Sequence, residues 1–118
     1  MLRVIGGTGD PRSRVENRIG EPTANPYLYI ASQLIAGRDG IAKNTDPGDP
    51  VRATYLADRP VLPGSLMEAV AAFKASSVMK RELGDAFHNY MIMLKEFEIN
   101  RFLSAVTDWE HAEYFEMY

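Results

Sequence analysis

The stretch Arg14-Val15-Glu16-Asn17-Arg18 places three charges on alternate positions of a segment that is typical of a β-strand. Because side chains of an extended chain alternate between faces, Arg14, Glu16 and Arg18 share one face. Val15 is then expected to point the other way, toward a core, whereas the pattern does not fix the side on which Asn17 lies.

A carboxylate flanked by two guanidinium groups supports two interpretations. Arginine holds phosphate or carboxylate oxygens in a bidentate fork, and a carboxylate is a hard oxygen donor for Mg²⁺, so the face suits an anionic ligand with a metal ion. The alternative is a solvated strand face whose charges compensate one another, since exposed ion pairs are nearly neutral in energy. Composition alone favours the solvated face.

The residues around this strand predict a β-hairpin. Residues 2–6 are typical of a short strand, the glycine-rich residues 6–11 of a loop and residues 13–19 of a second strand, so the hairpin is expected over about residues 2–19. Arg3 then lies near the charged face, depending on the register. The loop lacks the Lys-Ser/Thr ending of a P-loop and no helix follows it, which excludes that motif.

The rest of the chain, about residues 25–118, predicts helices. Asn25 and Pro26 are typical of a helix start, and Gly37 or Gly40 is expected to end that helix. Its apolar face is predicted to pack behind the charged strand and to hold it rigid. The residues of that face are Tyr27, Ile30, Ala31, Leu34 and Ile35.

Further helices are predicted beyond a long loop at residues 42–61, whose length indicates a functional or mobile segment. Ser65 and Glu68 form a capping-box pattern. The next segments are expected at residues 77–83, at about 86–106 and from Thr107 onward. The predicted fold class is therefore α+β: a short β-hairpin packed on several α-helices, in one domain at most.

Composition excludes several classes of function. The net charge of −3 gives no reason to expect nucleic acid, and no apolar run approaches the roughly 18 residues of a membrane span. The absence of cysteine excludes disulfides and thiolate metal sites, and no signal-peptide pattern follows Met1. We expect a soluble, cytoplasmic chain. His88 and His111 are interpreted as helix-surface residues, because they lack the spacing of a zinc helix.

Several motifs follow the charged strand in a fixed order. They are Ala24-Asn25-Pro26-Tyr27-Leu28, Ala36-Gly37-Arg38-Asp39-Gly40-Ile41, Leu62-Pro63-Gly64-Ser65-Leu66-x-Glu68-Ala69 and Trp109-Glu110-x-x-x-Tyr114. Together with Arg14-Val15-Glu16-Asn17-Arg18, their order and spacing resemble the C-terminal part of the glutamine synthetase catalytic domain over nearly the whole chain.

The resemblance implies a ligase of nitrogen metabolism that joins ammonia or another amine to the γ-carboxyl of glutamate. ATP first phosphorylates that carboxyl, with Mg²⁺ or Mn²⁺ as the metal, to give a γ-glutamyl phosphate. The resemblance implies that Glu16 binds the metal and that Arg14 and Arg3 bind the nucleotide phosphates. It also implies that Arg18 binds the glutamate substrate or its acyl phosphate, and that Arg18 and Arg3 are catalytic residues. With Asn17 the motif reads Arg-Val-Glu-Asn-Arg, which resembles the form seen in relatives that glutamylate amines other than ammonia.

The resemblance also implies that the other metal ligands and the ammonium-site residues lie upstream. It implies that residues 1–118 are one partial catalytic domain and that the β-hairpin comes from a larger sheet. The chain is therefore expected to be an inactive fragment, whose partners are the rest of its catalytic domain and neighbouring subunits of a ring-forming homo-oligomer. Two alternatives stay open: a stand-alone helical interaction module using Tyr114, Phe115 and Tyr118, and a nucleotide-binding regulator using the arginines. Tyr55 is a further candidate, because some bacterial glutamine synthetases carry a modified regulatory tyrosine in the corresponding loop.

Overall fold

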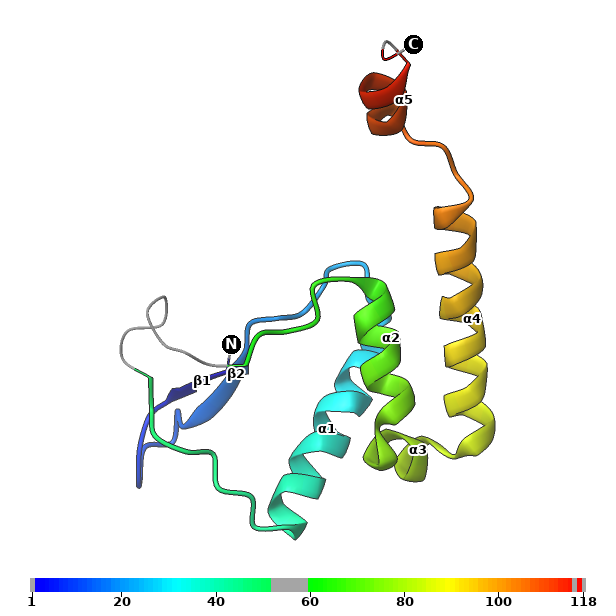
Figure 1. The fold of residues 1–118 in the computed structure, drawn as a ribbon. Coiled ribbons are helices and arrows are strands. Elements are labelled where there is room, and N and C mark those ends of the chain that lie inside the picture. Colours follow the sequence, from blue (N-terminus) through cyan, green and yellow to red (C-terminus); the bar gives the residue numbers. More distant parts are fainter. Residues whose placement is uncertain (1, 52–59, 116, 118) are drawn as a thin grey trace. The chain divides into compact units, whose positions relative to one another are not determined.

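The computed structural model describes residues 2–51, 60–115 and 117 and forms two compact units, Met1–Ala42 and Lys43–Tyr118. The first unit holds the strands β1 (Leu2–Ile5) and β2 (Arg14–Asn17) and the helix α1 (Pro26–Ala42). The second holds α2 (Leu66–Ala75), α3 (Ser77–Leu83), α4 (Asp85–Leu103) and α5 (Asp108–Tyr114) (Figure 1). A two-stranded antiparallel sheet combined with helices confirms the predicted α+β class.

The predicted hairpin is present, with Arg3 opposite Glu16 and Val4 opposite Val15 in the antiparallel register. Its second strand ends at Asn17, earlier than expected. Val15 is 64% exposed, so the expectation that it points toward a core is wrong within the described residues. A two-stranded ribbon buries little by itself and depends on whatever packs on it.

The loop between the strands is closed by Ser13. Its hydroxyl donates to the carbonyl oxygen of Gly7 at 2.8 Å and accepts from the Gly7 N–H at 3.1 Å. Gly6 adopts φ +88°, and a Cβ there would lie 2.5 Å from the Ser13 hydroxyl oxygen. Only glycine fits at this position, because both the positive φ and the close approach of Ser13 exclude a side chain.

Helix α1 begins as predicted, with the Asn25 side chain accepting from the N–H groups of Tyr27 and Leu28 at 3.0 and 3.3 Å. The predicted end is wrong, since α1 continues through Gly37 and Gly40 to Ala42. Glycine within a helix costs only about 1 kcal/mol relative to alanine and does not break it. The left-handed residue that follows the helix is Asn44, at φ 50°.

The predicted apolar face of α1 does not pack on the strand in the described residues. Tyr27, Ile30 and Leu34 are 82%, 56% and 63% exposed, and no residue of α1 is buried. The strand end instead contacts the side of α1 that carries Tyr29 and Gln33. The apolar face is therefore left for another part of the protein to cover.

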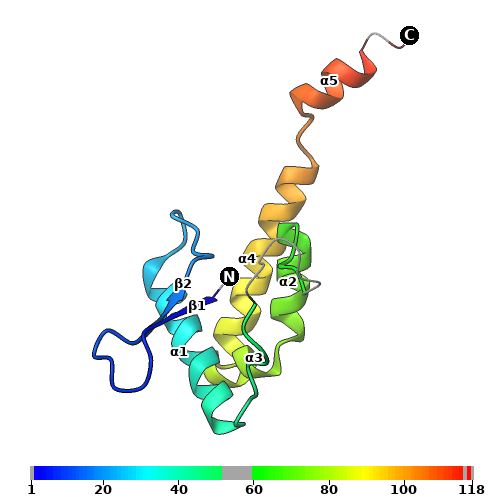
Figure 2. The ribbon, with the colours of Figure 1, turned by 90° about the vertical axis from the view of Figure 1, so that its left-hand side faces the viewer.

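In the second unit, α2 and α4 run side by side in opposite directions, joined through α3 (Figures 1 and 2). Their small core contains Val70 and Ile92, each 8% exposed, and His88, which is 2% exposed. Ser76 links α2 to α3: its backbone N–H bonds the Phe73 carbonyl, and its hydroxyl accepts from the Met79 N–H. Gly84 separates α3 from α4, as predicted.

The capping residues define where the later helices begin and end. Ser65 caps α2 as predicted, but the Glu68 carboxylate accepts from the Gly64 N–H at 2.7 Å, so the capping box is not completed at Ser65. Helix α4 ends at Leu103, three residues before the predicted end, where the Ser104 hydroxyl bonds the Asn100 carbonyl. No helix among the described residues is both long and apolar enough to cross a membrane.

Candidate functional site

The hairpin register brings the four candidate residues to one face of the two strands. Arg14 and Glu16 alternate along β2, and Arg18 follows one residue after that strand ends. Arg3 of β1 is directly opposite Glu16, so its side chain emerges on the same face as the carboxylate. The face thus carries three arginines and one glutamate, and we call it the Arg/Glu face.

Glu16 is bound by both neighbouring arginines of its own chain segment. Its Oε1 accepts from Nε and Nη2 of Arg14 at 3.3 and 2.9 Å. Its Oε2 accepts from Nε and Nη2 of Arg18 at 3.2 and 3.1 Å. Each guanidinium therefore donates two N–H groups to one carboxylate oxygen, and the carboxylate fixes the orientation of both arginines.

The remaining donors of Arg14 and the exposure of the site show which surface is available. Arg14 Nη1 donates to the Arg12 carbonyl at 3.2 Å, which anchors the guanidinium to the hairpin loop. The side chains of Arg14 and Arg18 are 53% and 48% exposed, whereas that of Glu16 is 25% exposed. The arginines thus cover the carboxylate, and their guanidinium groups form the exposed, positively charged part of the Arg/Glu face.

The electrostatics keep Glu16 ionised. Partial desolvation is the largest single influence and raises its pKa, but hydrogen bonds from Arg14 and Arg18 and their positive charges together outweigh it. The net result is a pKa of Glu16 below its ordinary value. A carboxylate that stays charged to low pH is a suitable ligand for a hard cation.

The residues present fit one ligand of a metal site and no more. A carboxylate has about four lone-pair positions, so Glu16 retains acceptor capacity beside its two arginine partners. Mg²⁺ needs near-octahedral oxygen coordination, and no group of three or more potential ligands among His, Cys, Asp and Glu lies together in the described residues. Further ligands for a metal held by Glu16 must come from outside these residues.

A shallow hollow of about 320 Å³ lies beside Arg14 at the loop end of the hairpin. Its lining residues are Val4, Ile5, Gly6, Gly7, Ser13, Arg14 and Val15. Arg12 does not line it: this residue binds Asp10 at 3.3 Å and has an 82% exposed side chain. The hollow therefore combines an apolar floor with a guanidinium at its edge.

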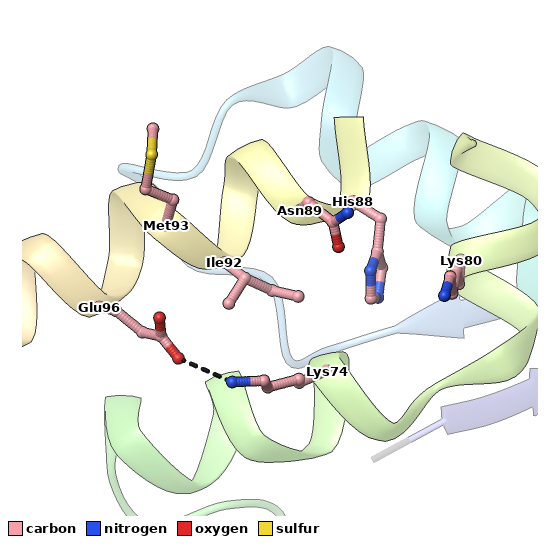
Figure 3. Close-up of a pocket in the computed structure, with 7 residues that line it drawn as sticks. All are labelled: Lys74, Lys80, His88, Asn89, Ile92, Met93 and Glu96. Carbon is pink, nitrogen blue, oxygen red and sulfur yellow. Dashed lines mark hydrogen bonds and ion pairs between the residues drawn. The ribbon is translucent and has the colours of Figure 1, made fainter. Parts of the chain in front are cut away.

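A second hollow, of about 400 Å³, lies within the second unit (Figure 3). Its lining residues are Lys74, Lys80, His88, Asn89, Ile92, Met93 and Glu96. Lys74 of α2 pairs with Glu96 of α4 at 3.1 Å across it, so those two charges satisfy each other. No motif from the sequence maps to this hollow, and we do not assign it a ligand.

The histidine interpretation is half correct. His111 is exposed, as predicted for the helix surface. His88 is not on the surface: it is buried, stacks on the Phe73 ring at 4.6 Å and binds the Phe73 carbonyl oxygen through Nε2 at 2.9 Å. It joins α2 to α4 and is a packing residue. The Tyr55 candidate lies outside the described residues.

Sequence reasoning missed one residue that supports the Arg/Glu face. Gln33 of α1 accepts a 2.6 Å hydrogen bond from the side-chain amide of Asn17. The available signal was an uncharged amide in a helix whose first twelve residues are otherwise mostly apolar. Helical periodicity alone does not reveal its partner.

A carboxylate framed by two arginines lies on a strand that is followed by a helix with an Asn-Pro start, and guanidinium groups favour anionic ligands. Comparison with known proteins then gives the family, since the model of the glutamine synthetase catalytic domain matches residues 1–114. The chain belongs to the glutamine synthetase catalytic-domain family, and it corresponds to a C-terminal portion of that domain. Its relatives are ligases.

Three relatives illustrate the range of similarity. A gamma-glutamylanilide synthase from Acinetobacter sp is 48% identical, covering 99% of this chain and 26% of the relative. Glutamine synthetases from Archaeoglobus fulgidus and Halobacterium salinarum are each 35% identical, covering 88% and 100% of this chain and 23% and 28% of the relatives. The chain thus spans about a quarter of the length of the curated relatives it matches.

Proposed function

We propose that this chain forms part of an ATP-dependent ligase that joins an amine to the γ-carboxyl of glutamate through a γ-glutamyl phosphate. The observation that carries the proposal is the Arg/Glu face, in which Glu16 holds Arg14 and Arg18 with four hydrogen bonds while Arg3 stands opposite. Membership of the glutamine synthetase family supports it.

In this proposal the arginines divide the anionic groups between them. Arg14 and Arg3 bind phosphate oxygens of the nucleotide, and Arg18 binds glutamate or its acyl phosphate. Arg18 and Arg3 act catalytically by stabilising charge while the phosphoryl group moves. Glu16 would contribute one oxygen ligand to Mg²⁺ or Mn²⁺, and the metal would supply positive charge that neutralises the transferring phosphoryl group.

The reaction has two steps. An oxygen of the γ-carboxylate of glutamate forms a bond to the γ-phosphorus of ATP, and the bond to the ADP oxygen breaks. The amine nitrogen then bonds to the acyl carbon, inorganic phosphate leaves with the electron pair, and the nitrogen loses a proton to a base. Arg3, Arg14 and Arg18 offer cations for both leaving groups, and in this proposal the base belongs to the rest of the enzyme.

The exposed apolar residues of α1 support the proposal that a partner completes the catalytic domain. Helix α1 contains few charged residues, and its apolar residues Tyr27 and Ile41 are 82% and 83% exposed. A helix that is apolar on most sides is typical of the interior of a larger protein. We infer that the rest of a catalytic domain, in a homo-oligomer, covers these residues, and that the chain is inactive without it.

The identity of the amine is a second question, on which the relatives differ. The chain is 48% identical to a gamma-glutamylanilide synthase and 35% identical to two glutamine synthetases over similar coverage. The higher identity favours an amine other than ammonia, with an aromatic amine as the first candidate.

The decisive experiment is a chimera in which this chain replaces the matching C-terminal segment of the Acinetobacter synthase. We expect phosphate release that depends on ATP, glutamate and aniline. A folded chimera that hydrolyses no ATP with any amine would refute the proposal. The unmodified Acinetobacter synthase is the positive control.

Titration calorimetry of the 118-residue chain with ADP and Mg²⁺ separates the alternatives. We expect no saturable binding, because one carboxylate and three arginines lack the other metal ligands. Saturable binding that is lost in Arg14→Ala favours the nucleotide-binding regulator instead. A stand-alone interaction module is favoured if the chain neither binds ADP nor supports activity in the chimera.

A further inference from the structure

Asn17 lies between Glu16 and Arg18 and makes two hydrogen bonds with its side chain. Its Oδ1 accepts from the backbone N–H of Ile19 at 3.1 Å, which closes a turn around Arg18. Its Nδ2 donates to Oε1 of Gln33, in the middle of α1, at 2.6 Å. One side chain thus shapes the backbone at Arg18 and ties it to a helix.

The chemistry of the neighbours fixes the orientation of both amides. The Ile19 N–H can only donate, so Asn17 must turn its oxygen toward it and its nitrogen toward Gln33. Gln33 must then present its oxygen, and its own nitrogen lies 3.4 Å from the Ser32 hydroxyl oxygen. The two amides therefore fit together in one orientation only, which favours a defined geometry over a loose contact.

A second contact supports the same junction. A Cβ at Gly20 would lie 3.2 Å from the Tyr29 hydroxyl oxygen, so the chain after the strand passes close over the Tyr29 ring. Tyr29 and Gln33 are four residues apart in α1 and therefore lie on the same side of the helix. The segment from Asn17 to Gly20 is thus bonded to α1 at Gln33 and lies close to Tyr29 on the same side of the helix.

Arg18 depends on this junction because the sheet does not hold it. Strand β2 ends at Asn17, and the register pairs Asn17 with Leu2 as its last position. The backbone at Arg18 is instead fixed by the Asn17 turn, whereas its guanidinium is fixed by Glu16 at 3.1 Å. The position of the guanidinium therefore requires both constraints.

We propose that the Asn17–Gln33 amide pair is a positioning device that sets Arg18, and through it Glu16, for the anionic substrate. The proposal rests on the ligase function proposed above for the Arg/Glu face. Neither amide belongs to the Arg/Glu face: Asn17 leaves the strand on the side opposite Glu16, and Gln33 lies on α1. Their role is to hold a guanidinium that the end of β2 would otherwise leave free to move.

Two variants of Gln33 test the device with a matched pair. Gln33→Glu keeps an oxygen that accepts from Asn17, and Gln33→Leu has similar size but no acceptor. In the 118-residue chain, NMR measures exchange with water of the Ile19 amide and of the Arg18 Nε–H. Because a hydrogen bond contributes a factor of about 3 to 10 in such equilibria, Gln33→Leu should speed both exchange rates by about that factor. Gln33→Glu should stay within about twofold of the unsubstituted chain.

The chimera adds a kinetic readout that a purely structural role would not move. Gln33→Leu should raise KM for glutamate by about 3- to 10-fold with kcat within about twofold, at an unchanged thermal midpoint. Gln33→Glu should restore KM. Equal behaviour of the two variants, or free exchange of the Ile19 amide in the unsubstituted chain, would overturn the proposal. An inactive but folded unsubstituted chimera counts against the ligase function alone, since the exchange rates still report the positioning.

Discussion

Arg3 and Glu16 occupy directly opposite positions of β1 and β2, so a cation from one strand faces the carboxylate of the other. Both oxygens of Glu16 already bind Arg14 and Arg18 within its own segment. Arg3 forms no ion pair in the described residues and therefore adds positive charge that Glu16 does not neutralise. With three arginines and one glutamate the Arg/Glu face carries a net charge of +2, which favours an anionic ligand over a cationic one.

Glu16→Gln in the chimera should lower kcat/KM by about 100-fold or more. Glutamine has nearly the same shape, but it supplies no negative charge for a metal, and its NH₂ group repels one of the two guanidinium groups that Glu16 now orients. Steady-state phosphate release measures the loss. The matched control is Glu98→Gln, which removes an exposed ion pair with Lys95 on α4 and should leave the rate unchanged. A near-normal rate for Glu16→Gln would refute the site assignment.

The pH dependence of the Arg/Glu face follows from the lowered pKa of Glu16. In the unfolded chain this carboxyl returns to an ordinary pKa near 4.5, so its ionised form favours the folded state. That contribution is fully present above about pH 4.5 and is lost as the pH falls through the lowered pKa of the folded state. Acidification from neutral pH to about 5 should therefore leave the hairpin intact, and its loss should begin only below that.

NMR titration of the Glu16 carboxyl carbon checks this assignment of cause. Arg18→Gln removes one hydrogen-bonded cation and should raise the Glu16 pKa toward 4.5. Arg12→Gln lies in the same hairpin but pairs with Asp10, and it should leave the Glu16 pKa lowered. An unchanged Glu16 pKa in Arg18→Gln would show that this arginine does not hold the carboxylate in solution.

The alternation of charges in residues 14–18 was enough to predict the Arg/Glu face, because strand geometry fixes which side chains share a side. The part of the hairpin that sequence did not determine is the register, on which the position of Arg3 depends. A shift of one residue would have placed Arg3 on the opposite face from Glu16. Turn chemistry at Gly6 and Ser13 fixes that register, and it involves contacts six or seven residues apart that no periodicity reports.

The helices show the limit of local signals in a different way. Asn25 and Ser65 were predicted as caps because the capping bond is local, within three residues. The burial of His88 was not predicted, because it depends on Phe73, which lies fifteen residues away on another helix. The roles of the metal, the nucleotide and each arginine stay predictions, since they depend on groups that the chain does not contain.

Gly6→Ala should disrupt the hairpin, whereas Gly7→Ala should not. A methyl group at Gly6 would meet the Ser13 hydroxyl oxygen at 2.5 Å and its Cα at 2.7 Å, in addition to the strain of φ +88°. At Gly7 a methyl group meets nothing within 4 Å in the described residues. Backbone amide exchange of the residues of β1 and β2 that are protected in the unsubstituted chain measures the effect. We expect a loss of protection of about 10-fold or more for Gly6→Ala and less than about twofold for Gly7→Ala.

His88 gives a prediction for the second unit that separates packing from hydrogen bonding. Its Nε2 bonds the Phe73 carbonyl at 2.9 Å, but its buried Nδ1 has no partner in the described part of the chain. The Phe73 carbonyl also accepts from the Ser76 N–H, so it keeps a partner when His88 is removed. His88→Leu therefore exchanges one hydrogen bond for the relief of one unsatisfied nitrogen, and the free energy of unfolding should change by less than about 1 kcal/mol.

His88→Ala is the matched variant, because it removes the same polar atoms and also leaves a cavity against Phe73. It should lower the free energy of unfolding by about 2–4 kcal/mol, as large-to-small substitutions in a core do. Denaturant unfolding of the 118-residue chain, followed by helix circular dichroism, compares the two. If His88→Leu destabilises as much as His88→Ala, the hydrogen bond to Phe73 is what holds α2 to α4. The packing of the ring, which we expect to dominate, would then be secondary.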